Sequence, residues 1–434
     1  MTTACAIETA TENGAARRAA FAITADGTYA ARLRLGAVSE AWFPERWTLD
    51  GPEPYAVPLP LDQPEEPDTE VLPLNDGRVL ISRRVADRHA FSLLYPAGPG
   101  TGQLQLGAVE GPELSLLPPA PDGQCAYALT VGERSTTIWQ VAGGAFGPAY
   151  VVEVPGRCTG GVWLDGTGRI LALDRELDGV VKAVAVDLGR DGEVTPLLQI
   201  TEESNDRLLL ADADSGLLLI RSDAAGHDRL GWGVLGSLSP VRFPECLRPA
   251  DCAVTPFAVQ PGQVLTPEAC AVALRIDGAA GSWVGVWRPA GRQLHQLRPP
   301  EGWLAGAGLW TRDGALRLPY ATREVPCGVA RVAAPADVPG AGAGLGAGSG
   351  GGPGLWLGGG PGPGFAPGPG TGAGAAGAVA PALGDAMGCA MNAAMEPSQT
   401  QSAGGEPYGA PHTPEMCRPV PLQQAPLTGR GTAD

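Results

Sequence analysis

Lysine is almost absent from this sequence, because Lys182 is the only one among 434 residues. Lys and Arg together number 30 against 46 Asp and Glu, so the formal net charge is −16. An acidic surface repels phosphate backbones, and we therefore expect no nucleic acid among the partners. The chain also has no uncharged apolar run of about 18 residues and no heptad repeat, so we expect neither a membrane span nor a coiled coil.

Metal-binding patterns are missing as well. The nine cysteines are scattered without a C-x-x-C pair, and none of the four histidines lies at ligand spacing from them. We therefore expect no metal site and no cofactor. Cys246 and Cys252 are nearest in sequence, and two reduced thiols are favoured over a disulfide between them. Residues 1–21 lack the basic start and apolar core of a secretory signal, so the expected location is the cytoplasm.

Glycine and proline are abundant, with 64 and 43 residues, and they concentrate in the last quarter of the chain. From Val338 to Gly384 there is no charged residue and almost no large side chain. Such a segment buries too little apolar surface to offset its ordering entropy, so residues 338–434 are predicted to be a disordered, low-complexity tail. Met387, Met391 and Met395 would share one face of a short helix, which leaves open a partner-docking stripe beside a chance spacing.

A short turn followed by an apolar run recurs throughout residues 1–337. The glycines of these turns lie 43 to 52 residues apart and are Gly27, Gly77, Gly123, Gly166, Gly216, Gly262 and Gly314. Most of them follow an aspartate, and Asp-Gly is a favoured hairpin turn because its glycine accepts a positive φ. Short β runs come next, such as residues 78–82 and 90–95. Three or four strands per unit at this period predict an all-β propeller, whereas a two-sheet sandwich would not explain the period.

Seven blades are expected, and six or eight stay open because the first unit is irregular around residues 52–64. The last unit lacks a strand before the glycine-rich segment begins. Residues 4–10 alternate between apolar and polar side chains, as an edge strand does. An open sheet edge invites aggregation, so we predict that the propeller of residues 1–337 closes by pairing residues 4–10 with residues 327–333.

The turn Pro121-Asp122-Gly123 and the strand after it resemble the blades of TolB-like propellers and of the N-terminal propeller of the prolyl oligopeptidase family. The stretch from Asp214 to Leu230 is similar to them too. The oligopeptidase resemblance implies an α/β-hydrolase domain after the propeller. No G-x-S-x-G elbow between a strand and a helix follows residue 337, so no catalytic residue is carried over.

Arginines recur in the loops predicted to lie on the opposite face of the ring from the Asp-Gly turns. The candidate ligand-binding residues on this face are Arg84, Arg134, Arg175, Arg221, His227, Asp228, Arg275 and Arg323. Guanidinium groups chelate oxyanions, so a ring of them predicts a small anionic ligand or an acidic peptide. The alternative is that each arginine pairs locally with an acidic neighbour.

Histidines and tryptophans each allow two interpretations. His227 lies between Gly226 and Asp228, where it could be a general base, a ligand contact or only a polar hairpin tip, and His89 allows the same interpretations. The tryptophans are expected in the core between blades more than on a sugar-binding surface. They are Trp139, Trp163, Trp232, Trp283, Trp287, Trp303 and Trp310.

These features favour a monomeric propeller that acts as a non-catalytic binding or scaffold module. Its expected partner is an unknown protein or a small anionic ligand. The alternative is a propeller hydrolase or lyase whose active site lies at the channel mouth, with His227 and Asp228 as the candidates.

Overall fold

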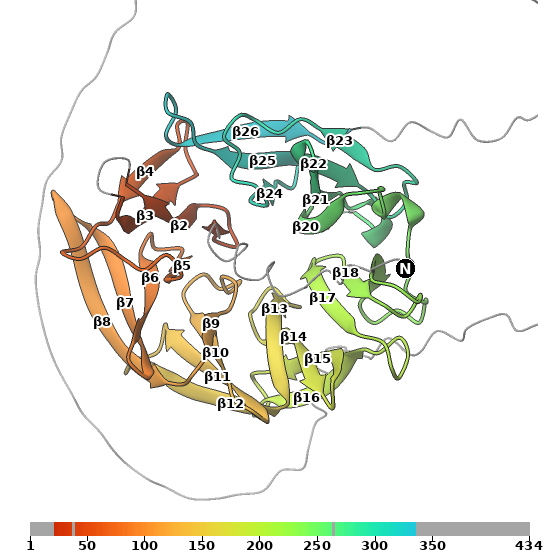
Figure 1. Cartoon of the computed structure of the whole chain (residues 1–434), viewed down its shortest axis with the longest axis horizontal. Helices are drawn as coiled ribbons and strands as arrows, with labels where there is room; N and C mark the ends of the chain where they lie inside the picture. The colour runs from red at the N-terminus through yellow and green to blue at the C-terminus, as the bar shows by residue number, and fades with distance from the viewer. Residues whose placement is uncertain (1–20, 37–39, 263–264, 336–434) are drawn as a thin grey trace, which may run out of the picture. The chain divides into compact units, whose positions relative to one another are not determined.

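The computed structural model describes residues 21–36, 40–262 and 265–335. These residues form seven antiparallel sheets, each built from consecutive strands, arranged as the blades of a propeller (Figure 1). The all-β fold and the blade number expected from the repeat are therefore confirmed. The predicted edge strand at residues 4–10 and the predicted tail at residues 338–434 lie outside the described residues.

The first four blades have four strands each. Blade 1 contains β1 (Ala22–Ile23), β2 (Tyr29–Leu35), β3 (Trp42–Thr48) and β4 (Tyr55–Pro58). Blade 2 contains β5 (Glu70–Pro73), β6 (Val79–Val85), β7 (Arg88–Ala97) and β8 (Gly100–Glu110). Blade 3 contains β9 (Leu114–Leu116), β10 (Ala126–Val131), β11 (Ser135–Ala142) and β12 (Ala149–Pro155). Blade 4 contains β13 (Arg157–Trp163), β14 (Ile170–Leu177), β15 (Val180–Asp187) and β16 (Glu193–Leu198).

The last three blades are less uniform. Blade 5 contains β17 (Asp206–Ala211), β18 (Leu217–Ser222) and β19 (Arg229–Val234). Blade 6 contains β20 (Ala253–Val259), β21 (Val272–Gly278), β22 (Gly281–Trp287) and β23 (His295–Leu297). Blade 7 contains β24 (Leu309–Trp310), β25 (Ala315–Tyr320) and β26 (Gly328–Ala333). Two 3-10 helices, η1 (Glu245–Leu247) and η2 (Pro267–Ala269), are the helices of the described residues, and neither is long or apolar enough to cross a bilayer.

The recurring glycine turns join the first and second strands of the blades, as the repeat predicts. In blade 3 the turn between β9 and β10 places Gly123 at a φ of 66°, which favours glycine. The carboxylate of Asp122 accepts hydrogen bonds of 3.0 Å from the backbone N–H groups of Gln124 and Cys125. Since neighbouring strands are antiparallel, the loops between second and third strands lie on the other face. We call this face, which also carries the connections between blades, the mouth face.

The core of the propeller lies between neighbouring blades. Leu219 and Trp232 of blade 5, for example, pack with Leu274 and Trp287 of blade 6 in one buried cluster. The tryptophans largely occupy such positions, since Trp163, Trp232, Trp287 and Trp310 are buried. Trp139 and Trp303 are half-buried, and Trp283 is exposed, with 39% of its surface accessible. The expectation that most tryptophans belong to the core is therefore confirmed.

Blades 1 and 7 meet through side-chain packing. Trp47 on β3 is completely buried in a cluster that includes Leu304, Cys327 and Val329 from the blade 7 side. The guanidinium of Arg317 on β25 also donates a hydrogen bond to the carbonyl of Leu49. Among the described strands, β26 pairs with β25 alone. The pairing of residues 327–333 with residues 4–10 stays a prediction.

Candidate functional site

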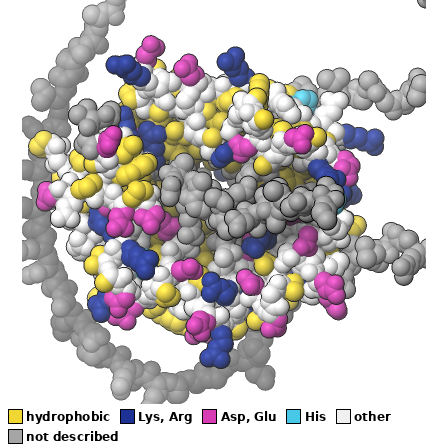
Figure 2. All heavy atoms as spheres, in the orientation of Figure 1, with side chains coloured by type: hydrophobic (Ala, Val, Ile, Leu, Met, Phe, Trp, Pro, Cys, Tyr) yellow, Lys and Arg dark blue, Asp and Glu magenta, His cyan; other side chains and the backbone are white. Residues whose placement is uncertain are grey.

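The arginines singled out in the sequence lie on the hairpins between second and third strands, but they belong to six different blades. Two of them pair locally. The Nε atom of Arg221 lies 3.7 Å from Oδ2 of Asp228, and Nε of Arg275 donates a 2.8 Å hydrogen bond to Oδ1 of Asp277. Positive and negative side chains are interspersed on the face shown in Figure 2. For these two arginines, local pairing is the arrangement that the structure displays.

The remaining candidates differ in exposure. Arg134 and Arg323 are exposed on the hairpins of blades 3 and 7, and His227 is exposed on the hairpin between β18 and β19. Arg175 is half-buried on β14, where its Nε atom has no hydrogen-bond partner among the described residues. The binding role of these residues stays a prediction, as does that of Arg221, Asp228 and Arg275.

Arg84 is the one candidate that lines a cleft of about 500 Å³ with walls from three blades. We call it the His89 cleft. Blade 2 contributes Ser82, Arg84 and His89 to its walls, together with the connection that leads into β5. Pro112 to Ser115 line it from blade 3, and Arg157 to Gly160 on β13 line it from blade 4.

His89 is the functional candidate whose environment the sequence did not indicate. It lies on β7 with only 8% of its surface exposed, and its Nε2 atom has no hydrogen-bond partner among the described residues. Burial, aided by the charge of Arg84, lowers the pKa of His89 below 6.5, while a hydrogen bond with the Gly111 backbone opposes that shift. The imidazole is therefore neutral at pH 7.

The interpretation of His89 as a polar hairpin tip is wrong, because the histidine points with the buried side of its strand. Phe91 and Leu93, two and four residues further on, are 0% and 3% exposed and share that side. Ser92 and Leu94, on the other side of β7, are also buried at 1% and 0%, so no alternation along this strand could have placed His89 inside.

The wall of the cleft formed by β13 contains a thiol that is poorly suited to nucleophilic attack. Cys158 is buried, and burial raises the pKa of its thiol to about 11. Its backbone N–H donates a 2.8 Å hydrogen bond to Oγ1 of Thr136. Because the reactive form of cysteine is the thiolate, this side chain is inert at neutral pH.

A buried acid lies directly behind the same wall. Burial raises the pKa of Asp174 to about 6, although the charge of Arg207 and a hydrogen bond from Leu208 oppose the shift. Its Oδ1 atom accepts a 2.9 Å hydrogen bond from the backbone N–H of Leu208, and its Oδ2 lies 3.7 Å from Nη1 of Arg207. Asp174 therefore joins blade 4 to the first strand of blade 5.

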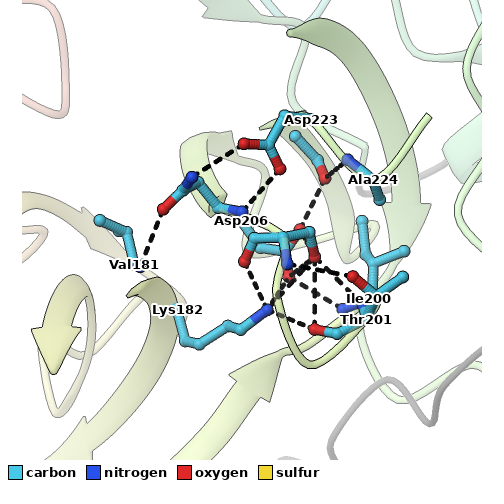
Figure 3. A network of polar contacts seen from close by, with 10 residues as sticks. Val181, Lys182, Ile200, Thr201, Asp206, Asp223 and Ala224 are labelled. Atoms are coloured by element: carbon cyan, nitrogen blue, oxygen red, sulfur yellow. Dashed lines mark hydrogen bonds and ion pairs between the residues drawn. The ribbon is translucent and has the colours of Figure 1, made fainter. Parts of the chain in front are cut away.

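The single lysine belongs to a second buried network between these blades (Figure 3). The Nζ atom of Lys182 donates hydrogen bonds of 2.5 Å to the carbonyl of Thr201, 2.6 Å to that of Ser204, and 2.8 Å to Oδ2 of Asp206. Asp206 is completely buried and also accepts a 2.6 Å bond from the hydroxyl of Ser222. The three donors of the ammonium are thus engaged, which assigns Lys182 a structural role.

No group of three or more His, Cys, Asp and Glu side chains in the described part of the chain could hold a metal ion. Cys246 and Cys252, between which a disulfide was an open alternative, both carry free thiols in the structure.

Comparison with known proteins finds no matching family model and no matching curated protein. Solved structures do match. The β-propeller domain of the Trilobed protease from Pyrococcus furiosus is 9% identical, with a TM-score of 0.46 over 71% of this chain and 91% of that one. TolB from Acinetobacter baumannii is 11% identical, with a TM-score of 0.38 over 70% of this chain and 79% of that one.

The acylaminoacyl peptidase from Pyrococcus horikoshii is a third neighbour, 10% identical with a TM-score of 0.44 over 70% of this chain and 49% of that one. The shared feature is the fold alone. TolB and the propeller-containing peptidases are also the proteins that the blade turns resemble. The present chain matches about half the length of the peptidase.

Proposed function

We propose that this protein is a non-catalytic binding module whose ligand occupies the His89 cleft. The observation that carries the proposal is a cleft of about 500 Å³ that contains an exposed guanidinium, Arg84, and a buried imidazole with an unpartnered nitrogen, His89. Ligand pockets typically have this volume and a few convergent polar groups. Three blades contribute to the walls, so the cleft exists only in the assembled propeller.

The absence of an activated nucleophile in the cleft supports binding over hydrolysis. Cys158 is held as a thiol by its raised pKa of about 11. In the part of the chain that the structure describes, no hydrogen bond joins His89 to Ser82, although both line the cleft. Nucleophilic catalysis requires such a pairing of nucleophile and base. His227 and Asp228, the candidates for a hydrolase or lyase, belong to an exposed hairpin of blade 5.

The test is a capture experiment with the full chain. The immobilised protein is incubated with an extract of its native cells, and bound small molecules and proteins are quantified by mass spectrometry. Arg84→Ala removes an exposed side chain of the cleft, whereas Arg190→Ala removes an exposed arginine that belongs neither to the cleft nor to the candidate ligand-binding residues, and it serves as the control. We expect Arg84→Ala to capture at least about tenfold less ligand than the wild type, because a charge-assisted hydrogen bond contributes more than about 1.4 kcal/mol to binding.

A third variant, Arg175→Ala with Arg221→Ala, tests the arginines outside the cleft. A ligand that is lost from this variant and retained by Arg84→Ala would place the binding site elsewhere on the mouth face. The proposal also fails if the wild-type protein enriches nothing over the bare resin.

A further inference from the structure

The His89 cleft holds groups of both charges that have no ion-pair partner. They are the exposed guanidinium of Arg84 and the exposed carboxylates of Glu66 and Asp68. None of these three side chains forms an ion pair or hydrogen bond within the described residues. Arg157, by contrast, lies 3.7 Å from a carboxylate oxygen of Glu113 and donates a 3.3 Å hydrogen bond to the carbonyl of Gly132.

His89 adds a hydrogen-bonding group that also lacks a partner. Its Nε2 atom is buried and unpartnered among the described residues, and 92% of the residue's surface is hidden while only 8% is exposed. A neutral imidazole can accept one hydrogen bond as well as donate one. Leaving a buried polar atom unpaired costs free energy. Because Nε2 is covered by neighbouring atoms, a ligand N–H reaches it only when a side chain of the cleft moves aside, and the new hydrogen bond then relieves that cost.

An apolar pocket of about 310 Å³ adjoins the cleft. The two cavities share Thr69 and Glu70 as lining residues, and strands β5 and β9 contribute to both. The second cavity is lined mainly by Leu33, Val71, Leu72 and residues 116–119. The two cavities are therefore neighbours, with Thr69 and Glu70 between them.

We propose that the ligand is a small zwitterion with an apolar side chain, namely a free α-amino acid or a short peptide. This inference rests on the proposed function of the His89 cleft. The carboxylate of the ligand pairs with the guanidinium of Arg84, and its ammonium pairs with Glu66 and Asp68. An N–H group of the ligand donates to Nε2 of His89, and the apolar side chain occupies the pocket next to Val71.

Each part of this ligand complements a different feature of the site. A simple anion would leave Glu66 and Asp68 facing it with like charge, and a simple cation would do the same with Arg84. Arginine binds a carboxylate through two parallel hydrogen bonds, which fixes the orientation of the ligand. The apolar pocket then selects among zwitterions by side chain, because burying apolar surface is favourable in proportion to its area.

The test measures binding of defined ligands to the full chain by isothermal titration calorimetry. Leucine, phenylalanine and the dipeptide Phe-Leu are the zwitterions, so the free amino acid and the short peptide are separate arms. The matched analogues each lack one feature. Phenethylamine has no carboxylate, N-acetylphenylalanine has no ammonium, and glycine has no apolar side chain. We expect at least one zwitterion to bind and each analogue to bind at least about tenfold more weakly.

Variants assign each contact to its residue. Arg84→Ala should abolish the preference for phenylalanine over phenethylamine, and Asp68→Asn with Glu66→Gln should abolish the preference over N-acetylphenylalanine. Both changes are at exposed side chains, so folding should be unaffected, and a thermal melt checks this. Arg190→Ala, at an exposed arginine that belongs neither to the cleft nor to the candidate ligand-binding residues, is the control and should leave every affinity unchanged. His89→Gln should weaken the binding of all the zwitterions. If His89→Gln is unstable, Arg84→Ala is the decisive variant.

Equal binding of the zwitterions and their analogues would overturn the inference, as would the absence of binding by all of them. These failures are distinct from failure of the proposed function. If the ligand captured from extract is lost from Arg84→Ala but is not a zwitterion, the cleft is still the binding site and the ligand class is wrong. If capture is insensitive to Arg84→Ala, the cleft itself is the wrong site and both proposals fail.

Discussion

At the scale of single residues, two buried acids on adjacent blades show how hydrogen-bond partners offset the cost of burying a carboxyl group. Asp206 is completely buried and accepts hydrogen bonds from Lys182, from the hydroxyl of Ser222 and from the backbone N–H of Ile200. Asp174 is also buried, at 6% exposure, but it has one backbone donor within 2.9 Å and a guanidinium only at 3.7 Å. Burial therefore dominates at Asp174 and raises its pKa to about 6.

This shift predicts a pH dependence of stability. Because the pKa of Asp174 is higher in the folded chain, at about 6, than the ordinary value of 3.8, the folded state binds the proton more tightly. The free energy of unfolding therefore falls as pH rises from about 4 to about 6 and is level above that range. Asp174→Asn has no titrating group at this position, so it lacks this loss of stability. As the pH rises from 4 to 7, the free energy of unfolding of the variant should therefore increase by up to about 3 kcal/mol relative to that of the wild type.

Urea unfolding at half-unit pH intervals measures this difference. Glu176→Gln, at an exposed position on the same strand β14, is the control and should keep the pH dependence of the wild type because it retains Asp174. A difference between Asp174→Asn and wild type that does not vary across this range would show that Asp174 does not titrate there.

At the scale of elements, the connection from β16 to β17 is held by Lys182 in addition to hydrogen bonds between its own residues Thr201 and Ser204. Residues 199–205 of this connection contribute two backbone carbonyls, from Thr201 and Ser204, to the lysine ammonium. The same ammonium contacts Asp206 at the start of β17. The side chain thus ties the third strand of blade 4 to the first strand of blade 5.

Removing the lysine should therefore destabilise the protein strongly. Lys182→Met leaves the buried carboxylate of Asp206 without its charged partner, and we expect a loss of about 3–5 kcal/mol in the free energy of unfolding. Adding Asp206→Asn to this variant removes the unpaired charge and should recover part of the loss. Chemical denaturation of the single and double variants measures both effects.

Arg190→Met provides the control for this experiment. Arg190 is exposed and lies 3.8 Å and 3.9 Å from the carboxylates of Asp187 and Glu193, so its removal should cost less than about 1 kcal/mol. If Lys182→Met were no more destabilising than Arg190→Met, Lys182 would not stabilise the connection from β16 to β17.

At the scale of the whole molecule, the contact between blades 1 and 7 determines whether the ring stays closed. Trp47 is buried against residues of blade 7, and Arg317 reaches the backbone of Leu49. Blade 7 has three strands among the described residues, whereas blades 1 to 4 and blade 6 have four. Its last described strand is β26. A fourth strand from residues 4–10, as the sequence predicts, would cover the outer edge of β26.

Deleting residues 1–20 tests this closure. We expect the shortened chain to unfold at a lower temperature and to aggregate more readily, because an uncovered strand edge can pair with another molecule. Deleting residues 338–434 is the matched truncation and should leave the melting temperature unchanged. Differential scanning calorimetry and light scattering measure the two effects, and equal melting temperatures for both truncations would argue against strand pairing by residues 4–10.

Local chemistry made the fold predictable from the sequence. A turn such as Asp122-Gly123 depends on the positive φ of its glycine and on hydrogen bonds that span only two or three residues. Repeated at intervals of 43 to 52 residues, such turns specify hairpins, and hairpins of apolar strands at this period specify a propeller. The sequence by itself therefore determined the fold class, the blade number and the face on which the arginines lie.

The tertiary structure alone decided which polar residues come together. His89 and Gly160 are 71 positions apart in the sequence yet line one cleft, while His227, beside an acid and an arginine, lies on an exposed hairpin. Lys182 likewise finds Asp206 across the boundary between two blades. Burial and charge pairing of this kind depend on how neighbouring blades pack. That packing cannot be predicted from the spacing of residues along one strand.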